Sequence, residues 1–399
     1  MPLHNLSERE FVISKVYSVV FLIYLLGLSV IAFIKPFHNW DMIPYMGIVL
    51  SYENSDPQKV YTQTYSELKS TVSADEYALL NSGAYRAGVS SSNEAFQQQL
   101  PFYTNRPLYT SLVYLFHVAG VPIINATVLV SILAGIGMAL VMYKWLSQNL
   151  EPLAALLISL ILVPATGILE VMRLSTPDAL SSLWLLLCLY MIVHNKPALY
   201  IGILGCLSIF TRADNILFMG LVVAFAGFYS NTYRISKKEF LILGICFLLS
   251  YFGVVLYFGS YGWETTFYHV FIGRLVTPLT TPHHVSVFMY ITTFIKQYVI
   301  TLLGYYLLPV FLFCAGVVAF SSNIRVTSQS IYKELSLLLL VFFVVRFLIF
   351  PDMQNRYFVP EFIMIGIAIA VSFLKKQNDQ AVYSTQSFGL SFLRKLKSI

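Results

Sequence analysis

The sequence predicts an all-α fold, a polytopic bundle of transmembrane helices, and three observations lead to this fold class. Of its 399 residues 57% are hydrophobic and only 11% are charged, whereas about a quarter of the residues in soluble domains are charged. The mean hydropathy is +0.72. Apolar runs close to the roughly 17–25 residues that cross a bilayer as one helix recur along most of the chain. We therefore expect a single membrane domain over residues 1–399.

The apolar runs predict about ten spans. The first run follows a short polar segment and lacks a small-residue cleavage site, so we expect a retained helix and not a signal peptide. Three of the middle runs are short and reach bilayer length only with polar residues at their outer ends. The expected spans are 11–34, 121–146, 152–169, 179–193, 198–210, 216–229, 240–258, 299–320, 335–350 and 362–374.

Basic residues in the loops predict the orientation of the bundle. They fall on one side of the alternating spans, at Lys144, Lys196, Arg234, Lys237, Lys238, Arg325, Lys333, Lys375 and Lys376. Because cytoplasmic loops carry an excess of Lys and Arg, this side and both termini are expected in the cytoplasm. The basic tail 375–399 is then placed to lie along anionic lipid headgroups.

Two long loops face outward in this topology. The loop 35–120 has aromatic residues spaced among Ser, Gln and Glu, which predicts a small extracytoplasmic subdomain of short amphipathic helices after the first span. The second outer loop, 260–297, holds Trp263, Glu264 and three histidines. All four cysteines lie inside apolar runs, so we expect neither disulfides nor a metal site built on sulfur. The basic residues are scattered and do not form the stripe that binds nucleic acid.

Ionisable residues gather in four short segments at the outer ends of spans, 38–45, 173–180, 211–215 and 351–357. A charge costs about 2.5–3.5 kcal/mol at the bilayer centre and less toward its edges, so four such clusters on one face need a reason. One reason is local pairing at helix ends, since Asp214 is two residues from Arg212 and Asp178 is five from Arg173. The other is a shared site on the outer face. Both interpretations stay open at this point.

Short motifs in these segments resemble the GT-C class of integral-membrane glycosyltransferases. Asp41, in the segment Trp-Asp-Met-Ile-Pro-Tyr, resembles the catalytic carboxylate of the first extracytoplasmic loop of that class. The segment 175–180 resembles the Pro-Asp-Ala stretch that opens a later span in bacterial members. The segment 207–214 is similar to their Thr-Arg-Pro-Asp span end, with Ala213 in place of proline. Arg356 and Tyr357 resemble the Arg-Tyr pair that precedes their last outer-to-inner helices.

The resemblance implies a mannosyltransferase-like enzyme of the bacterial inner (plasma) membrane with an extracytoplasmic active site. Its substrates are a polyprenyl-phosphate-linked sugar and a hydroxyl acceptor on a glycan, lipid or protein. Asp41 is the expected general base, and attack opposite the phosphate inverts the anomeric carbon. Arg212, Arg356 and Arg173 are expected to bind the donor phosphate, because a guanidinium pairs phosphate oxygens bidentately. No cofactor or metal is indicated. Further expected substrate contacts are Tyr45, Arg106, Asp178, Asp214, Glu264 and Tyr357.

Two other function classes remain open. A transporter or flippase of lipid-linked glycans would use the arginines to hold phosphate during translocation, but it is expected to carry ionisable residues at mid-bilayer on broken helices, often in inverted repeats. A glycan polymerase or ligase would need the arginines but not Asp41. The roles of two single residues also stay open. Arg106 binds a ligand or anchors an interfacial helix, and Glu264 is a second carboxylate of the site or an interfacial anchor.

Overall fold

The computed structural model describes residues 8–305, 307–321 and 330–374, and these residues form helices joined by loops. The predicted all-α class is confirmed, because within these ranges there is no β-strand. A single isolated parallel bridge joins Phe37 to Leu174. The predicted basic tail 375–399 lies outside the described residues.

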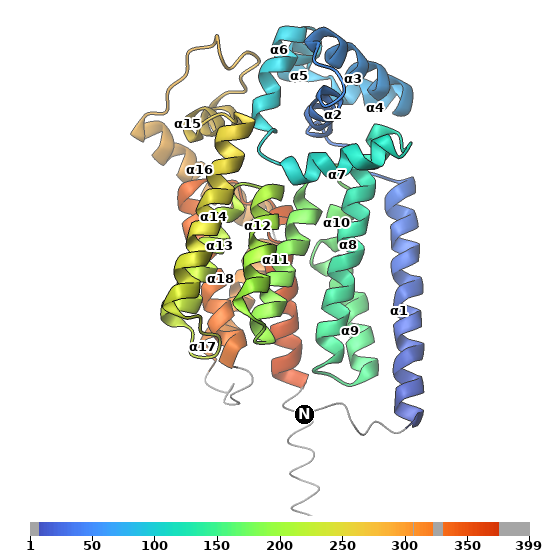
Figure 1. Cartoon of the computed structure of the whole chain (residues 1–399), viewed down its shortest axis with the longest axis vertical. Helices are drawn as coiled ribbons and strands as arrows, with labels where there is room; N and C mark the ends of the chain where they lie inside the picture. The colour runs from blue at the N-terminus through green and yellow to red at the C-terminus, as the bar shows by residue number, and fades with distance from the viewer. Residues whose placement is uncertain (1–7, 306, 322–329, 375–399) are drawn as a thin grey trace, which may run out of the picture.

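Most of the long helices run side by side as a bundle, and a group of short helices lies above it (Figure 1). At one edge α1 (Glu8–Ile34) packs against α8 (Ile123–Ser147) and α9 (Pro152–Ala165). The bundle continues through α10 (Ile168–Arg173), α11 (Asp178–Val193), α12 (Ala198–Thr211), α13 (Asn215–Ala224) with its π-helical extension η2 (Phe225–Tyr229), α14 (Lys237–Phe258), α16 (Val287–Gly304), α17 (Leu307–Phe320), α18 (Ser330–Ile349) and a last helix, Val359–Leu374.

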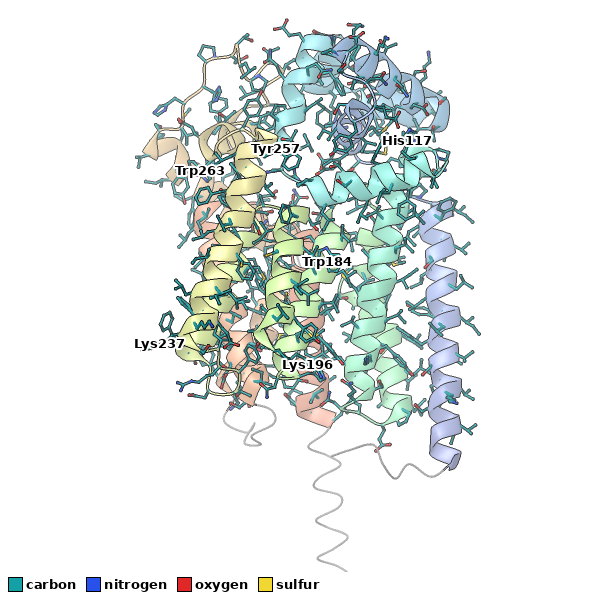
Figure 2. The ribbon with its side chains drawn as sticks, in the orientation of Figure 1. His117, Trp184, Lys196, Lys237, Tyr257 and Trp263 are labelled. Carbon is teal, nitrogen blue, oxygen red and sulfur yellow. The ribbon has the colours of Figure 1, made fainter. Side chains whose placement is uncertain are left out.

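Four helices are long and apolar enough to cross a membrane, and they indicate a membrane protein. They are Val12–Ile34, Ile123–Ser147, Lys237–Phe258 and Val287–Gly304. The helix Ile123–Ser147 is mostly buried inside the bundle, whereas the other three turn most of their apolar surface outward. Figure 2 shows Lys196 and Lys237 at one end of the bundle and His117 and Trp263 at the other. These two lysines therefore mark one end of the bundle, and further helices cover the opposite end.

Two expected spans are each divided into two helices. The run 152–169 breaks at Gly167, whose left-handed backbone (φ +86°) ends α9 and starts α10. Glycine adopts this conformation without the steric cost that other residues incur. The run 299–320 breaks at Tyr305, whose backbone is not helical. Pro309 explains this break, because proline has no N–H for the carbonyl of residue 305 and its ring would clash with that carbonyl.

Residues 35–120 fold into short helices, which Figure 1 shows above the bundle. Capping side chains begin two of them: Asp56 accepts a hydrogen bond from the backbone N–H of Gln58, and Ser73 accepts one from the backbone N–H of Glu76. One helix departs from the expected amphipathic pattern, since Met42 to Leu50 of α2 are all buried. The helices are α2 (Met42–Ser51), α3 (Pro57–Thr71), α4 (Ala74–Leu80), α5 (Gly83–Ser90), α6 (Asn93–Gln99), η1 (Leu100–Phe102) and α7 (Pro107–Val118).

The segment after α14 packs on these short helices. It contains α15 (Trp263–Phe267) and η3 (Tyr268–Ile272). The side-chain amide of Gln99 donates to the carbonyls of Leu275 and Val276 at 3.0 and 2.8 Å. The ring of His269 lies 4.3 Å from that of Phe102. The two long loops predicted from the sequence therefore contact each other at the same end of the bundle.

Candidate functional site

Asp41 stands immediately before α2, at the junction of the short helices and the bundle. Its carboxylate does not cap that helix. The hydroxyl of Tyr103 donates to Oδ1 at 2.9 Å, and the amide of Asn39 donates to Oδ2 at 3.3 Å. Nη2 of Arg356 lies 3.5 Å from Oδ2. The side chain is 31% exposed, so the carboxylate is held on both oxygens and is still reachable from solvent.

Arg356 joins Asp41 to a second carboxylate from a distant part of the chain. It lies in η5 (Asn355–Tyr357), between α18 and the last helix. Its Nη1 lies 3.5 Å from Oδ2 of Asp178, the first residue of α11. Asp178 is only 3% exposed, and it also accepts hydrogen bonds from the Thr176 hydroxyl, at 2.7 Å, and from Nη1 of Arg212. One guanidinium therefore bridges two aspartates, one directly before α2 and the other at the start of α11.

The same network continues through Arg212 and Asp214. Arg212, just after α12, binds Asp214 with two parallel hydrogen bonds, Nε to Oδ1 at 3.1 Å and Nη2 to Oδ2 at 2.8 Å. Nη1 of Arg346, from α18, donates to the same Asp214 Oδ2 at 3.2 Å. Desolvation by its neighbours opposes ionisation of Asp214, whose side chain is still 43% exposed, but the two guanidinium groups outweigh it and hold its pKa well below the usual range. Asp214 is therefore an ionised carboxylate at neutral pH.

Tyr357 lies at the centre of the arginines. Its ring centroid is 4.5 Å from Cζ of Arg212, 5.2 Å from Arg346 and 5.0 Å from Arg356. The electron-rich face of an aromatic ring attracts such cations. Burial raises the pKa of the Tyr357 hydroxyl, so it remains a neutral phenol that accepts a hydrogen bond from Arg356 at 3.1 Å. Tyr357 thus holds three like charges in fixed positions around one ring.

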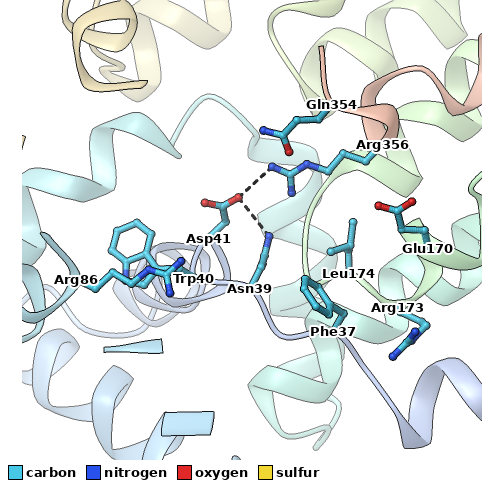
Figure 3. Close-up of a pocket in the computed structure, with 10 residues that line it drawn as sticks. All are labelled: Phe37, Asn39, Trp40, Asp41, Arg86, Glu170, Arg173, Leu174, Gln354 and Arg356. Atoms are coloured by element: carbon cyan, nitrogen blue, oxygen red, sulfur yellow. Dashed lines mark hydrogen bonds and ion pairs between the residues drawn. The ribbon is translucent and has the colours of Figure 1, made fainter. Parts of the chain in front are cut away.

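A cavity of about 390 Å³ opens beside Asp41. Figure 3 shows Trp40 and Arg86 on one side of Asp41, and Glu170 and Arg173 on the other. Three arginines and two carboxylates line the cavity, which leaves one positive charge in excess. The complete lining is Phe37, Asn39, Trp40, Asp41, Arg86, Glu170, Arg173, Leu174, Gln354 and Arg356.

Most of the residues singled out from the sequence meet at this place. Six of them form the network itself: Asp41, Asp178, Arg212, Asp214, Arg356 and Tyr357. Arg106 lies next to Tyr103, the hydrogen-bond partner of Asp41. Its guanidinium is 5.7 Å from the ring of Tyr45 and 5.5 Å from that of Tyr103. Arg173 lines the cavity, and its Nε donates to the carbonyl of Lys35 at 2.7 Å.

Glu264 is placed differently. It belongs to α15 and is exposed. Its Oε1 accepts a hydrogen bond from the backbone N–H of Val285 at 2.9 Å and lies 2.7 Å from Nδ1 of His284. Glu264 therefore fastens its own loop, and the carboxylates of the network come from elsewhere in the chain.

Several residues of the site could not be found from the sequence motifs. Asn39 and Gln354 lie inside two of the four polar segments, and this proximity was their only signal. Tyr103, Arg86 and Glu170 come from segments without a motif, and only the fold brings them to Asp41 or its cavity.

The guanidinium groups of the site fit an anion. Within residues 8–305, 307–321 and 330–374, no three side chains of His, Cys, Asp or Glu lie close enough to share a metal ion. The aspartates of the network already face guanidinium groups. An anion that enters the cavity would instead meet Arg356 beside an excess of positive charge. No family model, curated protein or solved structure matches the chain, so the site itself has to indicate the function.

Proposed function

We propose that the protein is a membrane glycosyltransferase that moves a sugar from a polyprenyl-phosphate donor to a hydroxyl acceptor. The observation that carries the proposal is the junction of Asp41, Arg356 and Arg212 in one network beside a cavity. A carboxylate that accepts a proton and a guanidinium that faces phosphate are the two groups that such a transfer needs. Here they lie 3.5 Å apart.

Arg356 is the proposed phosphate ligand. Its contacts to Asp41 and Asp178, both 3.5 Å, are longer than the roughly 2.7–2.9 Å of a tight charge-assisted hydrogen bond. Its Nε has no hydrogen-bond partner among the described residues, so donors remain for phosphate oxygens. Arg212 is bound at 2.8 and 3.1 Å and is nearly buried, so its role is to hold Asp178 and Tyr357 in position.

The charge of the cavity fits a phosphodiester donor. A polyprenyl-phosphate sugar carries one negative charge, which balances the one excess positive charge of the lining. Arg173 adds a second guanidinium on the side where Phe37 and Leu174 form an apolar wall next to the end of α1. This wall suits the first isoprenoid carbons. As the bond to phosphate breaks, negative charge grows on the leaving group, and Arg356 stabilises the transition state more than the ground state.

Asp41 is the proposed general base. The acceptor hydroxyl gives its proton to the carboxylate, its oxygen attacks the anomeric carbon, and the bond from that carbon to the phosphate oxygen breaks. Polyprenyl phosphate leaves with the electron pair, and the anomeric configuration is inverted. The hydrogen bonds from Tyr103 and Asn39 fix the direction of the carboxylate.

The same proposal includes about ten spans in the bacterial inner membrane, both termini in the cytoplasm and the site at the extracytoplasmic face. Lys196 and Lys237 lie at the end of the bundle away from α15, as a cytoplasmic end requires (Figure 2). The short apolar helices of 10–17 residues would complete their spans with the polar ends that carry Asp178, Arg212 and Asp214.

The test is sugar transfer by the purified full-length chain in lipid nanodiscs, supplied with polyprenyl-phosphate sugars and mixed hydroxyl acceptors. Asp41→Asn is expected to lower turnover by about 10²–10⁴, the usual contribution of a general base. Asp75→Asn, which changes an exposed aspartate of α4, is the matched control and should retain turnover. Full activity of a folded Asp41→Asn variant would refute the assignment. Loss in Arg356→Gln together with full activity in Asp41→Asn would favour a polymerase or ligase.

A further inference from the structure

The end of the cavity near Trp40 contains a positive charge without an acidic partner. Arg86 belongs to α5, and its Nη1 donates to the carbonyl of Leu79 at 3.2 Å. Among the described residues no carboxylate lies within 4.0 Å of its guanidinium, whereas Arg356 and Arg212 are each paired with two aspartates. Arg86 is therefore free to pair with an anion that enters the cavity.

A second unpaired guanidinium lies outside the cavity lining, next to Tyr85. Arg274, from the segment after η3, has its Cζ 5.8 Å from the ring centroid of Tyr85. That ring in turn packs 5.1 Å from the ring of Trp40. No carboxylate in the described part of the chain is within 4.0 Å of Arg274. Two cations thus flank one aromatic wall, and they come from the two different loops.

Trp40 supplies an independent sign of a missing ligand. Its side chain is 7% exposed and lines the cavity, and its indole N–H has no hydrogen-bond partner among the residues described. A buried donor without an acceptor is costly, and an indole N–H can only donate. Arg86, Arg274 and the indole N–H of Trp40 all offer donors, so they fit a ligand rich in oxygen and negatively charged.

Asp41 lies between this end and the end with Arg173 (Figure 3). Taken with the function proposed above, on which this step rests, the two ends divide the substrates: the lipid-linked phosphate beside Arg173 and the acceptor beside Arg86. We propose that the end lined by Trp40 and Arg86, with Arg274 next to it across Tyr85, is the acceptor subsite. It takes an anionic saccharide whose carboxylate or phosphate pairs with the two arginines while one of its hydroxyls reaches Asp41.

Binding of small saccharides tests the proposal without any transfer step. The probes are methyl glucoside, methyl glucuronoside and glucose 6-phosphate, titrated calorimetrically into the full-length protein in nanodiscs of neutral lipid. At least one anionic probe is expected to bind about tenfold more tightly than the neutral one, a factor that corresponds to about 1.4 kcal/mol. The preference between the two anionic probes then identifies carboxylate or phosphate as the natural group.

Variants show which residue causes the preference for anionic probes. Arg86→Gln is expected to reduce the affinity for the anionic probe to that for methyl glucoside, while Lys69→Gln, an exposed cation at the end of α3, keeps the preference. Trp40→Phe removes only the indole donor and should weaken both kinds of probe. Equal binding of neutral and anionic probes, an unchanged preference in Arg86→Gln, or no binding of any probe at millimolar concentration overturns the proposal. An anion preference in a protein that transfers no sugar would instead overturn the proposed function and leave the anion subsite standing.

Discussion

Replacing Asp178 by Asn should destabilise the protein more than any other single loss of a carboxylate in the network. Asp178 is 3% exposed and faces two guanidinium groups, those of Arg212 and Arg356. The amide keeps the size of the side chain but loses the charge. It also places an N–H₂ group next to an arginine or to the Thr176 hydroxyl, which now donates to the carboxylate.

The expected magnitude follows from the partners that remain. Removing one partner of a buried ion pair costs about 3–5 kcal/mol, because a charge is left buried without compensation. Arg212 keeps both hydrogen bonds to Asp214, and Arg356 keeps its contact with Asp41 at 3.5 Å. We therefore expect a loss near the lower limit, about 3 kcal/mol of the free energy of unfolding.

Trp184 offers a local probe for this measurement. Its indole N–H donates to the hydroxyl of Thr211 at 3.1 Å, directly before Arg212. Unfolding in mixed detergent micelles, followed by tryptophan fluorescence, should show the earlier transition of Asp178→Asn. Asp75→Asn, which changes an exposed aspartate of α4, should unfold with the wild type. The double variant Asp178→Asn/Arg356→Gln should lose less than the sum of its single variants, because it removes both charges of one contact. Wild-type stability of Asp178→Asn would refute the view that its charge compensates two buried guanidinium groups.

Two further predictions concern packing and pH. Gly205→Ala in α12 should cost about 1–3 kcal/mol, because the added Cβ would lie 2.5 Å from ring atoms of Phe247 and 2.7 Å from Cε of Met219. Gly244→Ala in α14, with open space around the added carbon, should instead gain up to about 1 kcal/mol, and equal unfolding midpoints for the two variants would contradict this packing. Burial and then Arg274 lower the pKa of His269 to about 3, and its Nδ1 accepts a hydrogen bond from the backbone N–H of Leu275 at 3.1 Å. Since the unfolded pKa is about 6.5, His269 contributes stability above that pH that is lost as the pH falls toward 3. Proteolysis of the segment 260–286 should accelerate between pH 7 and 4.5 in the wild type and less so in His269→Gln, and the same acceleration in both proteins would exclude His269 as the cause.

The helical class could be predicted because apolar runs of this length leave few alternatives, but the ends and breaks of helices depended on single residues. Gly167 and Pro309 stand inside apolar runs, where composition gives no sign that they interrupt the helix. The burial of α2 from Met42 to Leu50 was also invisible in the sequence, because it depends on helices that pack around it from elsewhere.

The candidate site was predictable in its position and less so in its pairing. The short-range pair of Arg212 and Asp214 is confirmed. The local pair of Arg173 and Asp178 is wrong: Arg173 donates to the carbonyl of Lys35, and Asp178 faces Arg212 and Arg356. Spacing along the chain indicates which charges can meet within one turn, but the partner of a buried charge is decided by which helix ends the fold brings together.

The balance of charges in this network bears on why it exists. Asp41, Asp178 and Asp214 alternate with Arg356, Arg212 and Arg346, so the group is neutral as a whole. Asp178, Arg212 and Arg346 are its buried members. Neutrality makes burial tolerable, but well-packed apolar residues in place of such ion pairs are often as stable or more stable. Stability alone therefore does not account for six charges at one end of a bundle. The loosest contacts are the two of Arg356, which borders the cavity. The tight pairs thus hold in place one guanidinium that still has donors for a ligand.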